Sequence, residues 1–204
     1  MRAIAKLISY ISHPLLIPTY CMLYLIWSNP YMFGSPTTPQ GAQLLASTFL
    51  NSFLLPTIFI VLMRLLGFID DFQLEDRRQR VLPFMAVSFF FLWAYIAFKQ
   101  AFSIEILSDV MLGAGIAVCV ALVITVLFYK ISIHTIGMGG LVALVFYSIL
   151  VGIPTHNITW FFCLLILSAG LVGTARLLLD AHVEREVLGG YLVGFCCMFV
   201  VFLF

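Results

Sequence analysis

Charged residues are scarce in this chain, and their scarcity decides its class. Asp, Glu, Lys and Arg together make up 9% of its 204 residues, whereas hydrophobic residues make up 63%. A globular protein in water needs far more charged surface than this, so a water-soluble domain is excluded. Roughly 20 apolar residues cross a bilayer as one helix, so this length suits six to seven spans. We therefore expect an all-α, polytopic transmembrane helix bundle of about seven spans, forming a single integral membrane domain over residues 1–204.

Two further absences narrow the function. The five cysteines stand in apolar runs without a Cys-x-x-Cys pair or a Cys/His grouping, so neither a zinc site nor a disulfide framework is expected. The net charge is only +1, which argues against a polybasic surface and so against nucleic acid as a partner. We expect no metal and no other cofactor, and the oligomeric state stays open.

Apolar runs alternate with short polar connections along the chain. The runs fall at about 14–33, 43–67, 82–103, 106–130, 134–153, 158–179 and 187–204. Two basic residues precede the first run, but Pro14 and Pro18 interrupt it and no small-residue cleavage site follows, so a retained first span is predicted rather than a signal peptide. Six glycines within the runs are expected to let helices pack closely, namely Gly113, Gly115, Gly170, Gly173, Gly190 and Gly194.

Basic residues gather on one side of the predicted membrane. If the runs cross it alternately, nine of the ten Lys and Arg residues fall on one side, here called the motif face, and Lys99 lies nearest the other. The positive-inside rule places the motif face in the cytoplasm. Three polar segments meet there, at residues 67–83, 130–135 and 176–186. Polar groups are costly at membrane depth, so their convergence indicates a functional site.

The third segment contains Arg176, His182 and Glu186 among residues that are otherwise nearly all apolar. Residues at i and i+4 share one face of a helix, so Glu186 is predicted to lie one turn from His182 and to orient its imidazole. A nucleophilic or acid–base histidine is commonly supported in this way. The alternative is an ordinary charged helix end at the membrane surface.

The second segment directly precedes the fifth apolar run. A helix N-terminus offers free backbone N–H groups and the positive end of the helix dipole, so it favours an anion. Lys130 adds a positive charge there. The alternatives are that Ser132 is a plain helix cap and that His134 is a histidine at the membrane interface.

Together these segments resemble the type 2 phosphatidic acid phosphatase superfamily, which also contains vanadium haloperoxidases and glucose-6-phosphatase. Arg176, His182 and Glu186, followed by Gly190 and Gly194, are similar to its third motif, which runs Ser-Arg, five residues, His, three residues, Asp, then spaced glycines. The resemblance covers about residues 64 to 200.

The other two motifs are matched less fully. Residues 131–135 look like the second motif, Pro-Ser-Gly-His, and residues 77–83 loosely echo the first, Lys, six residues, Arg-Pro. The lysine of the first motif is missing, and glutamate replaces aspartate in the third. Ala175 stands in place of a serine, and Ile131 and Ile133 stand in place of proline and glycine.

The resemblance implies hydrolysis of a lipid-linked phosphate or diphosphate without a metal, in a bacterial inner membrane. His182 would attack phosphorus and form a phosphohistidine, Glu186 would hold its ring, and His134 would protonate the leaving oxygen. The phosphoryl oxygens would be bound by cationic or hydroxyl side chains, namely Arg176, Ser132, Lys130, Arg80, Arg78 and Arg77. The expected partner is a lipid phosphate from the bilayer, such as undecaprenyl diphosphate, phosphatidylglycerol phosphate, phosphatidate or a lipid A phosphate.

Three other functions stay open. A catalytically degenerate relative would bind a phospholipid or act as a scaffold without cleaving it. A transporter would need an internal repeat with broken helices in both halves, and no convincing repeat is present. Asp70-Asp71 and Glu75-Asp76 are similar to the Mg²⁺-binding stretches of membrane prenyltransferases, but the second acidic motif of those enzymes is absent. Pairing of these acids with neighbouring arginines is the simpler alternative.

Overall fold

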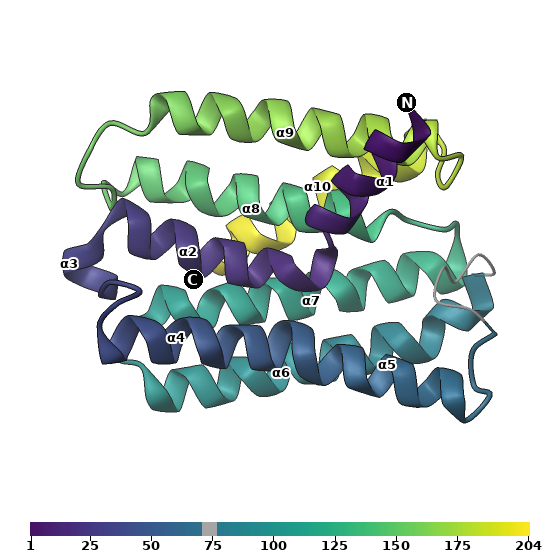
Figure 1. The fold of residues 1–204 in the computed structure, drawn as a ribbon, viewed down its shortest axis with the longest axis horizontal. Helices are drawn as coiled ribbons and strands as arrows, with labels where there is room; N and C mark the ends of the chain where they lie inside the picture. Colours follow the sequence, from purple (N-terminus) through teal and green to yellow (C-terminus); the bar gives the residue numbers. More distant parts are fainter. Residues whose placement is uncertain (71–76) are drawn as a thin grey trace.

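The computed structural model of the chain describes residues 1–70 and 77–204, with the exception of the Arg77 side chain. Every regular element in these ranges is a helix, so the predicted all-α class is confirmed (Figure 1). The α-helices are α1 (Arg2–Ile11), α2 (Ile17–Ser28), α3 (Pro30–Phe33), α4 (Pro39–Phe49), α5 (Leu55–Leu65), α6 (Val81–Ala101), α7 (Glu105–Leu127), α8 (Ile133–Leu150), α9 (Thr159–Leu178) and α10 (Glu184–Val201). Three short elements join them, namely the 3₁₀ turns η1 (Pro14–Leu16) and η3 (Arg77–Arg80) and the π-helical turn η2 (Leu50–Leu54).

Five helical segments within the described ranges are long and apolar enough to cross a membrane. They are Pro39–Leu65, Arg78–Ala101, Glu105–Leu127, Ile133–Leu150 and Thr159–Leu178. The chain is therefore an integral membrane protein. The first and last of the seven predicted spans are helical but do not qualify by length and composition. With 12 residues, α2 is too short for a hydrocarbon layer of about 30 Å, and α10 carries three charged residues in its first turn.

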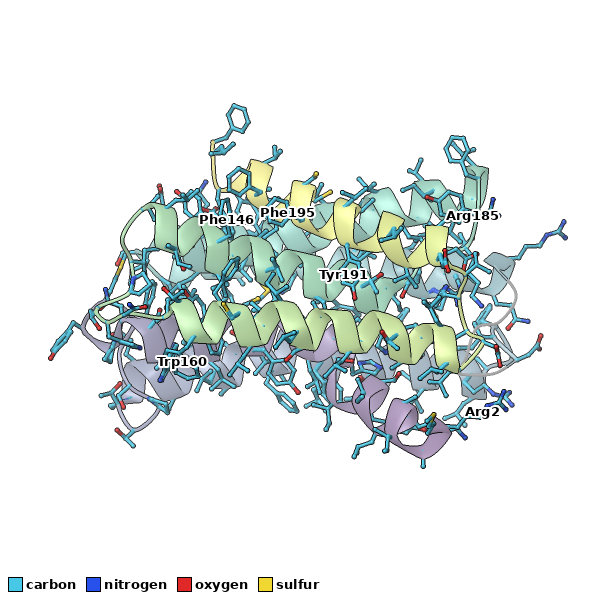
Figure 2. The ribbon with its side chains drawn as sticks, turned by 90° about the horizontal axis from the view of Figure 1, so that it is seen from above. Arg2, Phe146, Trp160, Arg185, Tyr191 and Phe195 are labelled. Carbon is cyan, nitrogen blue, oxygen red and sulfur yellow. The ribbon has the colours of Figure 1, made fainter. Side chains whose placement is uncertain are left out.

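The long helices run alternately, so their connections gather at two ends of the bundle (Figure 1). The end of α5, the start of α6, the α7–α8 linker and the α9–α10 turn lie at one end, together with α1. The α8–α9 connection and α3 lie at the other. Figure 2 accordingly shows Arg2 and Arg185 at one end and Trp160 at the opposite end. The described parts of the three polar segments thus share the motif face, as predicted.

The predicted helix running through both His182 and Glu186 is wrong. Asp180 has a φ of 54°, in the left-handed region, and the chain turns there after α9. An aspartate tolerates this conformation better than most residues do. A new helix, α10, begins only at Glu184, and the Val183 N–H donates to Glu186 Oε2 at 3.4 Å. His182 therefore lies in the turn, just ahead of the helix that carries Glu186.

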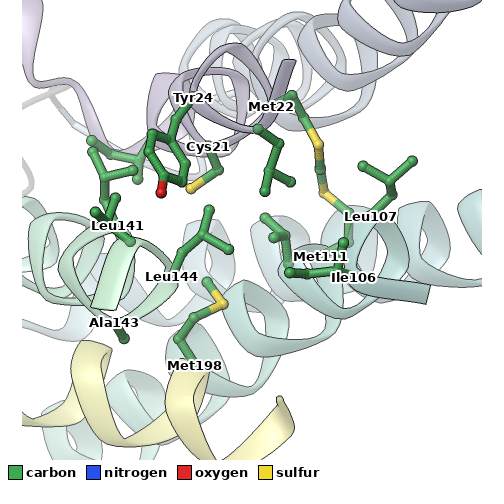
Figure 3. Packing of buried hydrophobic residues seen from close by; sticks show 14 of the residues in the cluster. Cys21, Met22, Tyr24, Ile106, Leu107, Met111, Leu141, Ala143, Leu144 and Met198 are labelled. Carbon is green, nitrogen blue, oxygen red and sulfur yellow. The ribbon is translucent and has the colours of Figure 1, made fainter. Parts of the chain in front are cut away.

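Side chains from four helices fill the centre of the bundle. Cys21 and Met22 of α2, Met111 of α7, Leu144 of α8 and Met198 of α10 belong to one buried cluster (Figure 3). Four of these residues are completely buried, and Met198 is nearly so. This layer holds the helices that carry the polar segments in fixed positions below the motif face.

Glycines of α10 bring that helix unusually close to α8. A Cβ atom at Gly194 would lie 1.9 Å from the carbonyl oxygen of Ile136, and one at Gly190 would lie 2.0 Å from Thr135 Oγ1. No larger residue fits at either position without a shift of α8 backbone or of a buried side chain. Gly170 is different, because nothing lies within 4 Å of the position its Cβ would occupy. The packing role predicted for Gly170 is therefore wrong.

A Gly194→Ala substitution tests this close contact. The added methyl group would overlap backbone atoms of α8, so we expect the free energy of unfolding to fall by about 1–3 kcal/mol. Gly170→Ala is the matched control, and its effect should stay within about 0.5 kcal/mol. Thermal unfolding of the detergent-solubilised variants measures both. Equal Tm values for the two variants would contradict the close packing of α10 on α8.

Candidate functional site

His182 is buried and held by a carboxylate. Its side chain is 2% exposed, and its Nδ1–H donates to Glu186 Oε2 at 2.8 Å. Glu186 lies in the first turn of α10, where the helix dipole favours a negative charge. Because the proton is on Nδ1, the lone pair of a neutral ring is on Nε2. That nitrogen has no hydrogen-bond partner among the residues the structure describes. The predicted pairing is confirmed, although it forms across the start of a helix.

The surroundings of His182 favour its neutral form. Burial lowers the pKa of His182 far below its ordinary value, and the positive charges of Arg80, Lys130 and Arg176 act in the same direction. A histidine with so low a pKa is unprotonated at neutral pH. A neutral imidazole is what a nucleophile requires, since the protonated ring has no free lone pair.

Ser132 lies next to the His182–Glu186 pair because its backbone is hydrogen-bonded to the backbone of α10. Its N–H donates to the carbonyl oxygen of Glu186 at 3.3 Å. Its side chain is completely buried, and within the described chain Oγ has no hydrogen-bond partner. The alternative role as a side-chain cap of α8 is thus wrong for this structure. A buried hydroxyl without a partner costs free energy that a ligand atom would recover.

Arg80 joins the first polar segment to the second. Only 5% of Arg80 is exposed, and its Nη1 donates to the carbonyl oxygen of Ile131 at 3.2 Å. Arg78, by contrast, is exposed at the surface, and the side chain of Arg77 lies outside the described residues. Of the three arginines predicted here, the structure brings Arg80 into the site.

Arg176 reaches the site from the end of α9. Its Nη1 donates to Ser9 Oγ at 3.3 Å, whereas its Nε is buried and has no partner in the part of the chain that is described. A guanidinium group needs its N–H donors satisfied when it leaves water. Arg176 Nε and Ser132 Oγ are therefore two buried groups of the site that lack a hydrogen bond.

Two residues near the N-terminus, Ser9 and His13, were not predicted from the sequence. Ser9 of α1 accepts a hydrogen bond from His134 Nε2 at its carbonyl oxygen, at 3.2 Å, besides the one from Arg176. The ring of His13 lies edge-on to that of His134, with 6.2 Å between centroids. One signal could have found Ser9: it and Ala5 are small residues one turn apart on α1, so they mark a face on which another helix can pack closely.

The acidic stretch from Asp70 to Asp76 is described only at Asp70. Asp70 binds Gln79 rather than an arginine: its N–H donates to Gln79 Oε1 at 3.1 Å, and the Gln79 amide donates back to its carboxylate. Asp71, Glu75 and Asp76 lie outside the described residues. Within the described ranges, no three His, Cys, Asp or Glu side chains come together as metal ligands would.

Comparison of the chain with models of protein families, with characterised proteins and with solved structures gives no match. The function is therefore inferred from the geometry of the site. Four separated segments contribute to one cluster of histidines, cations and hydrogen-bond donors on the motif face. Such a cluster suits an anion with several oxygen atoms.

The state of the His182 ring can be measured directly. We expect it to stay neutral, with the proton on Nδ1, as the pH falls from 8 through its ordinary pKa to 5, because its pKa is lowered. Long-range ¹H–¹⁵N spectra of histidine-labelled protein report both the charge and the tautomer, and His182→Gln assigns the signal. Glu186→Ala should mix the two tautomers, whereas Glu184→Ala, at an exposed position of the same turn, should not. A protonated ring at pH 6 would contradict this assignment.

Proposed function

We propose that the protein is a membrane phosphatase that hydrolyses a lipid-linked phosphate or diphosphate through a phosphohistidine on His182. One observation carries the proposal: a buried histidine, oriented by Glu186 and with Nε2 unbonded, lies among cations beside two buried groups that lack partners. A phosphoryl group has the charge and the acceptor oxygens to satisfy all of them. The resemblance of the three segments to phosphatase motifs supports the same reaction.

Binding of the phosphoryl group follows from the positions of the donors. Ser132 Oγ, Arg176 Nε and the N-terminus of α8 supply hydrogen bonds, while Arg80 and Lys130 add positive charge. In phosphoryl transfer, negative charge spreads over three equatorial oxygens, so fixed donors and cations lower the barrier. These groups are held by packed helices, so they need not reorganise as the reaction proceeds.

In the first chemical step, Nε2 of His182 attacks phosphorus and the bond from phosphorus to the leaving oxygen breaks. The ring gains a positive charge, which Glu186 stabilises. The leaving oxygen takes a proton from the imidazolium form of His134, the proposed donor, which becomes a neutral ring. Its Nε2–H is bound to the Ser9 carbonyl oxygen, so donation requires that bond to be exchanged for one to the leaving oxygen. Water then attacks phosphorus and gives a proton to the neutral His134, while the bond from phosphorus to Nε2 of His182 breaks; phosphate is released, and the His182 ring is neutral again.

A second candidate is a protein that binds a phospholipid without cleaving it. The contact between His134 and Ser9 favours this candidate, because it occupies the proposed acid. Ile133 favours it too, since a side chain stands where the resembling motif has glycine. Neither a transporter nor a prenyltransferase is favoured by a comparable observation.

We also propose that α2 with η1 and α10 complete a bundle of seven spans in a bacterial inner membrane, with the motif face in the cytoplasm. Four basic residues outside the proposed site support this orientation, namely Arg2, Lys6, Arg64 and Arg185, against Lys99 at the other end. A periplasmic phosphatase reporter fused after Phe204 should then be active. An inactive reporter, with a cytoplasmic reporter active at the same position, would reverse the orientation.

Phosphate release by the purified protein tests the reaction. We expect release in EDTA from at least one member of a panel of lipid phosphates and diphosphates. His182→Ala should reduce it roughly a thousandfold or more, because the nucleophile is lost. Glu184→Ala, next to the site but exposed, is the matched control and should retain activity. Acid-labile ³²P on His182 would identify the intermediate. Binding of the same lipids without release, by wild type and His182→Ala alike, would establish the second candidate.

A further inference from the structure

The polar site described above is here called the His182 cluster; it comprises His182, Glu186, Ser132, His134, Arg80 and Arg176. An apolar cavity of about 240 Å³ lies inside the bundle next to it. It is bounded by η1 and by helices α2, α5, α6, α7, α8 and α10. His13 lines it, and the ring of His13 also contacts that of His134 in the cluster. Ile133, between Ser132 and His134 in the chain, lines it as well. The cavity and the polar cluster are therefore neighbours joined by these two side chains.

The cavity extends from the motif face toward the middle of the bundle. On α6 it is lined from Pro83 to Phe91, and on α7 from Val118 back to Val110. Each stretch covers eight residue steps, or about 12 Å at roughly 1.5 Å per residue. Its inner end lies at Cys21 and Met198, where the packed layer of Figure 3 begins. This axis is the direction that the chain of a membrane lipid takes below its head group.

The walls of the cavity suit hydrocarbon rather than water. Small residues of α7, α8 and α10 keep it open, namely Ala114, Ala117, Gly137, Gly140 and Gly194. Apart from His13 and Thr57, its lining side chains are apolar or a thiol, so water would find few hydrogen-bond partners in it. Val61 of α5 lines the cavity and is 38% exposed, so it lies at the border of the cavity rather than deep in the bundle.

The helix on that side is irregular where it approaches His13. The π-helical turn η2 interrupts the α4–α5 segment, and Pro56 follows it. Phe53 of this turn contacts the His13 ring edge-on, with 6.1 Å between centroids. π-Helical turns within longer helices are frequent at functional sites. His13 is thus held between η2 on one side and His134 on the other, at the mouth of the cavity.

We propose that this cavity binds the hydrocarbon chain of the lipid whose phosphate occupies the His182 cluster, with His13 at the junction between phosphate and chain. That the head group is a phosphate rests on the proposed function. The position of the hydrocarbon chain is inferred from the shape and apolar lining of the cavity alone. Nδ1 of His13 accepts the Leu15 N–H at 3.4 Å, so a neutral ring has its proton on Nε2 and can donate it to an oxygen at the junction.

Photolabelling of the reconstituted full-length protein tests the position of the chain. The probe is octyl phosphate with a diazirine at the chain end, and octanol with the same group is the control for chain partitioning without phosphate. We expect the phosphate probe to label the inner cavity, at Phe91, Val110 or Met198. Each methylene moved from water into the cavity raises affinity about fourfold, so shorter alkyl phosphates should compete progressively less well.

Two variants of α7 form a matched pair for this experiment. Val118→Phe places a ring in the cavity, whereas Val126→Phe makes the same change at a residue that is 50% exposed on the outside. The ring of Val118→Phe should displace two or three methylenes of the probe from the cavity, so cavity labelling should fall roughly tenfold or more. Labelling of Val126→Phe should be unchanged. Thr57→Phe fills the cavity from α5 and should act like Val118→Phe. Unfolding temperatures of all three verify that they fold.

The outcomes separate this proposal from the proposed reaction. Labelling spread over lipid-facing residues such as Leu62 and Val123, and equal in the paired variants, would overturn the chain site. Cavity labelling without phosphate release would leave the chain site standing while the phosphatase fails. Phosphate release without cavity labelling would support the phosphatase reaction and overturn the chain site. Equal cavity labelling by the octanol control would overturn the link between the cavity and the phosphate site.

Discussion

The site depends on how closely α10 approaches α8. Gly190 and Gly194 leave room for the backbone of α8, and this proximity allows the hydrogen bond from the Ser132 N–H to the Glu186 carbonyl oxygen. Glu186 in turn orients His182. The proposed nucleophile and the proposed anion-binding serine therefore occupy adjacent positions because two helices meet without side chains between them. Helix packing in membranes commonly uses small residues in this way.

Two positive charges of the site are held in part by hydrogen bonds to neutral oxygens. Arg80 binds the Ile131 carbonyl oxygen and Arg176 binds the Ser9 hydroxyl, while the carboxylate of Glu186 is used by His182. A neutral partner such as the Ser9 hydroxyl positions the Arg176 guanidinium without cancelling its charge. The cluster thus keeps the net positive potential that an incoming phosphate requires and that keeps His182 unprotonated.

Residue spacing predicted much of this site. The spacing of residues indicates which of them lie one helical turn apart, and the spacing of apolar runs indicates which connections lie on the same side of the membrane. The His182–Glu186 pair and the meeting of Arg80, Ser132 and Arg176 on one face follow from these spacings. The left-handed turn at Asp180 is a single backbone conformation that no apolar pattern marks. Ser9 and His13 were missed because their roles arise from the packing of α1 and η1 on distant helices. Pro18 and Pro30, each in the first turn of a helix, mark where the predicted first span divides into short elements.

Ser9 has an energetic consequence for ligand affinity. Its carbonyl and hydroxyl oxygens already hold the donors of His134 and of Arg176 Nη1, so a phosphate reaching either donor replaces a bond instead of adding one. Such an exchange contributes little net free energy. Within the described residues, Ser132 Oγ and Arg176 Nε have no hydrogen bond to break, so each bond to a ligand is a net gain. These two groups therefore contribute most of the affinity for the ligand. The donors bound to Ser9, on His134 and Arg176 Nη1, bind the ligand only when negative charge develops on the leaving oxygen, because only then is the exchange of hydrogen bonds favourable.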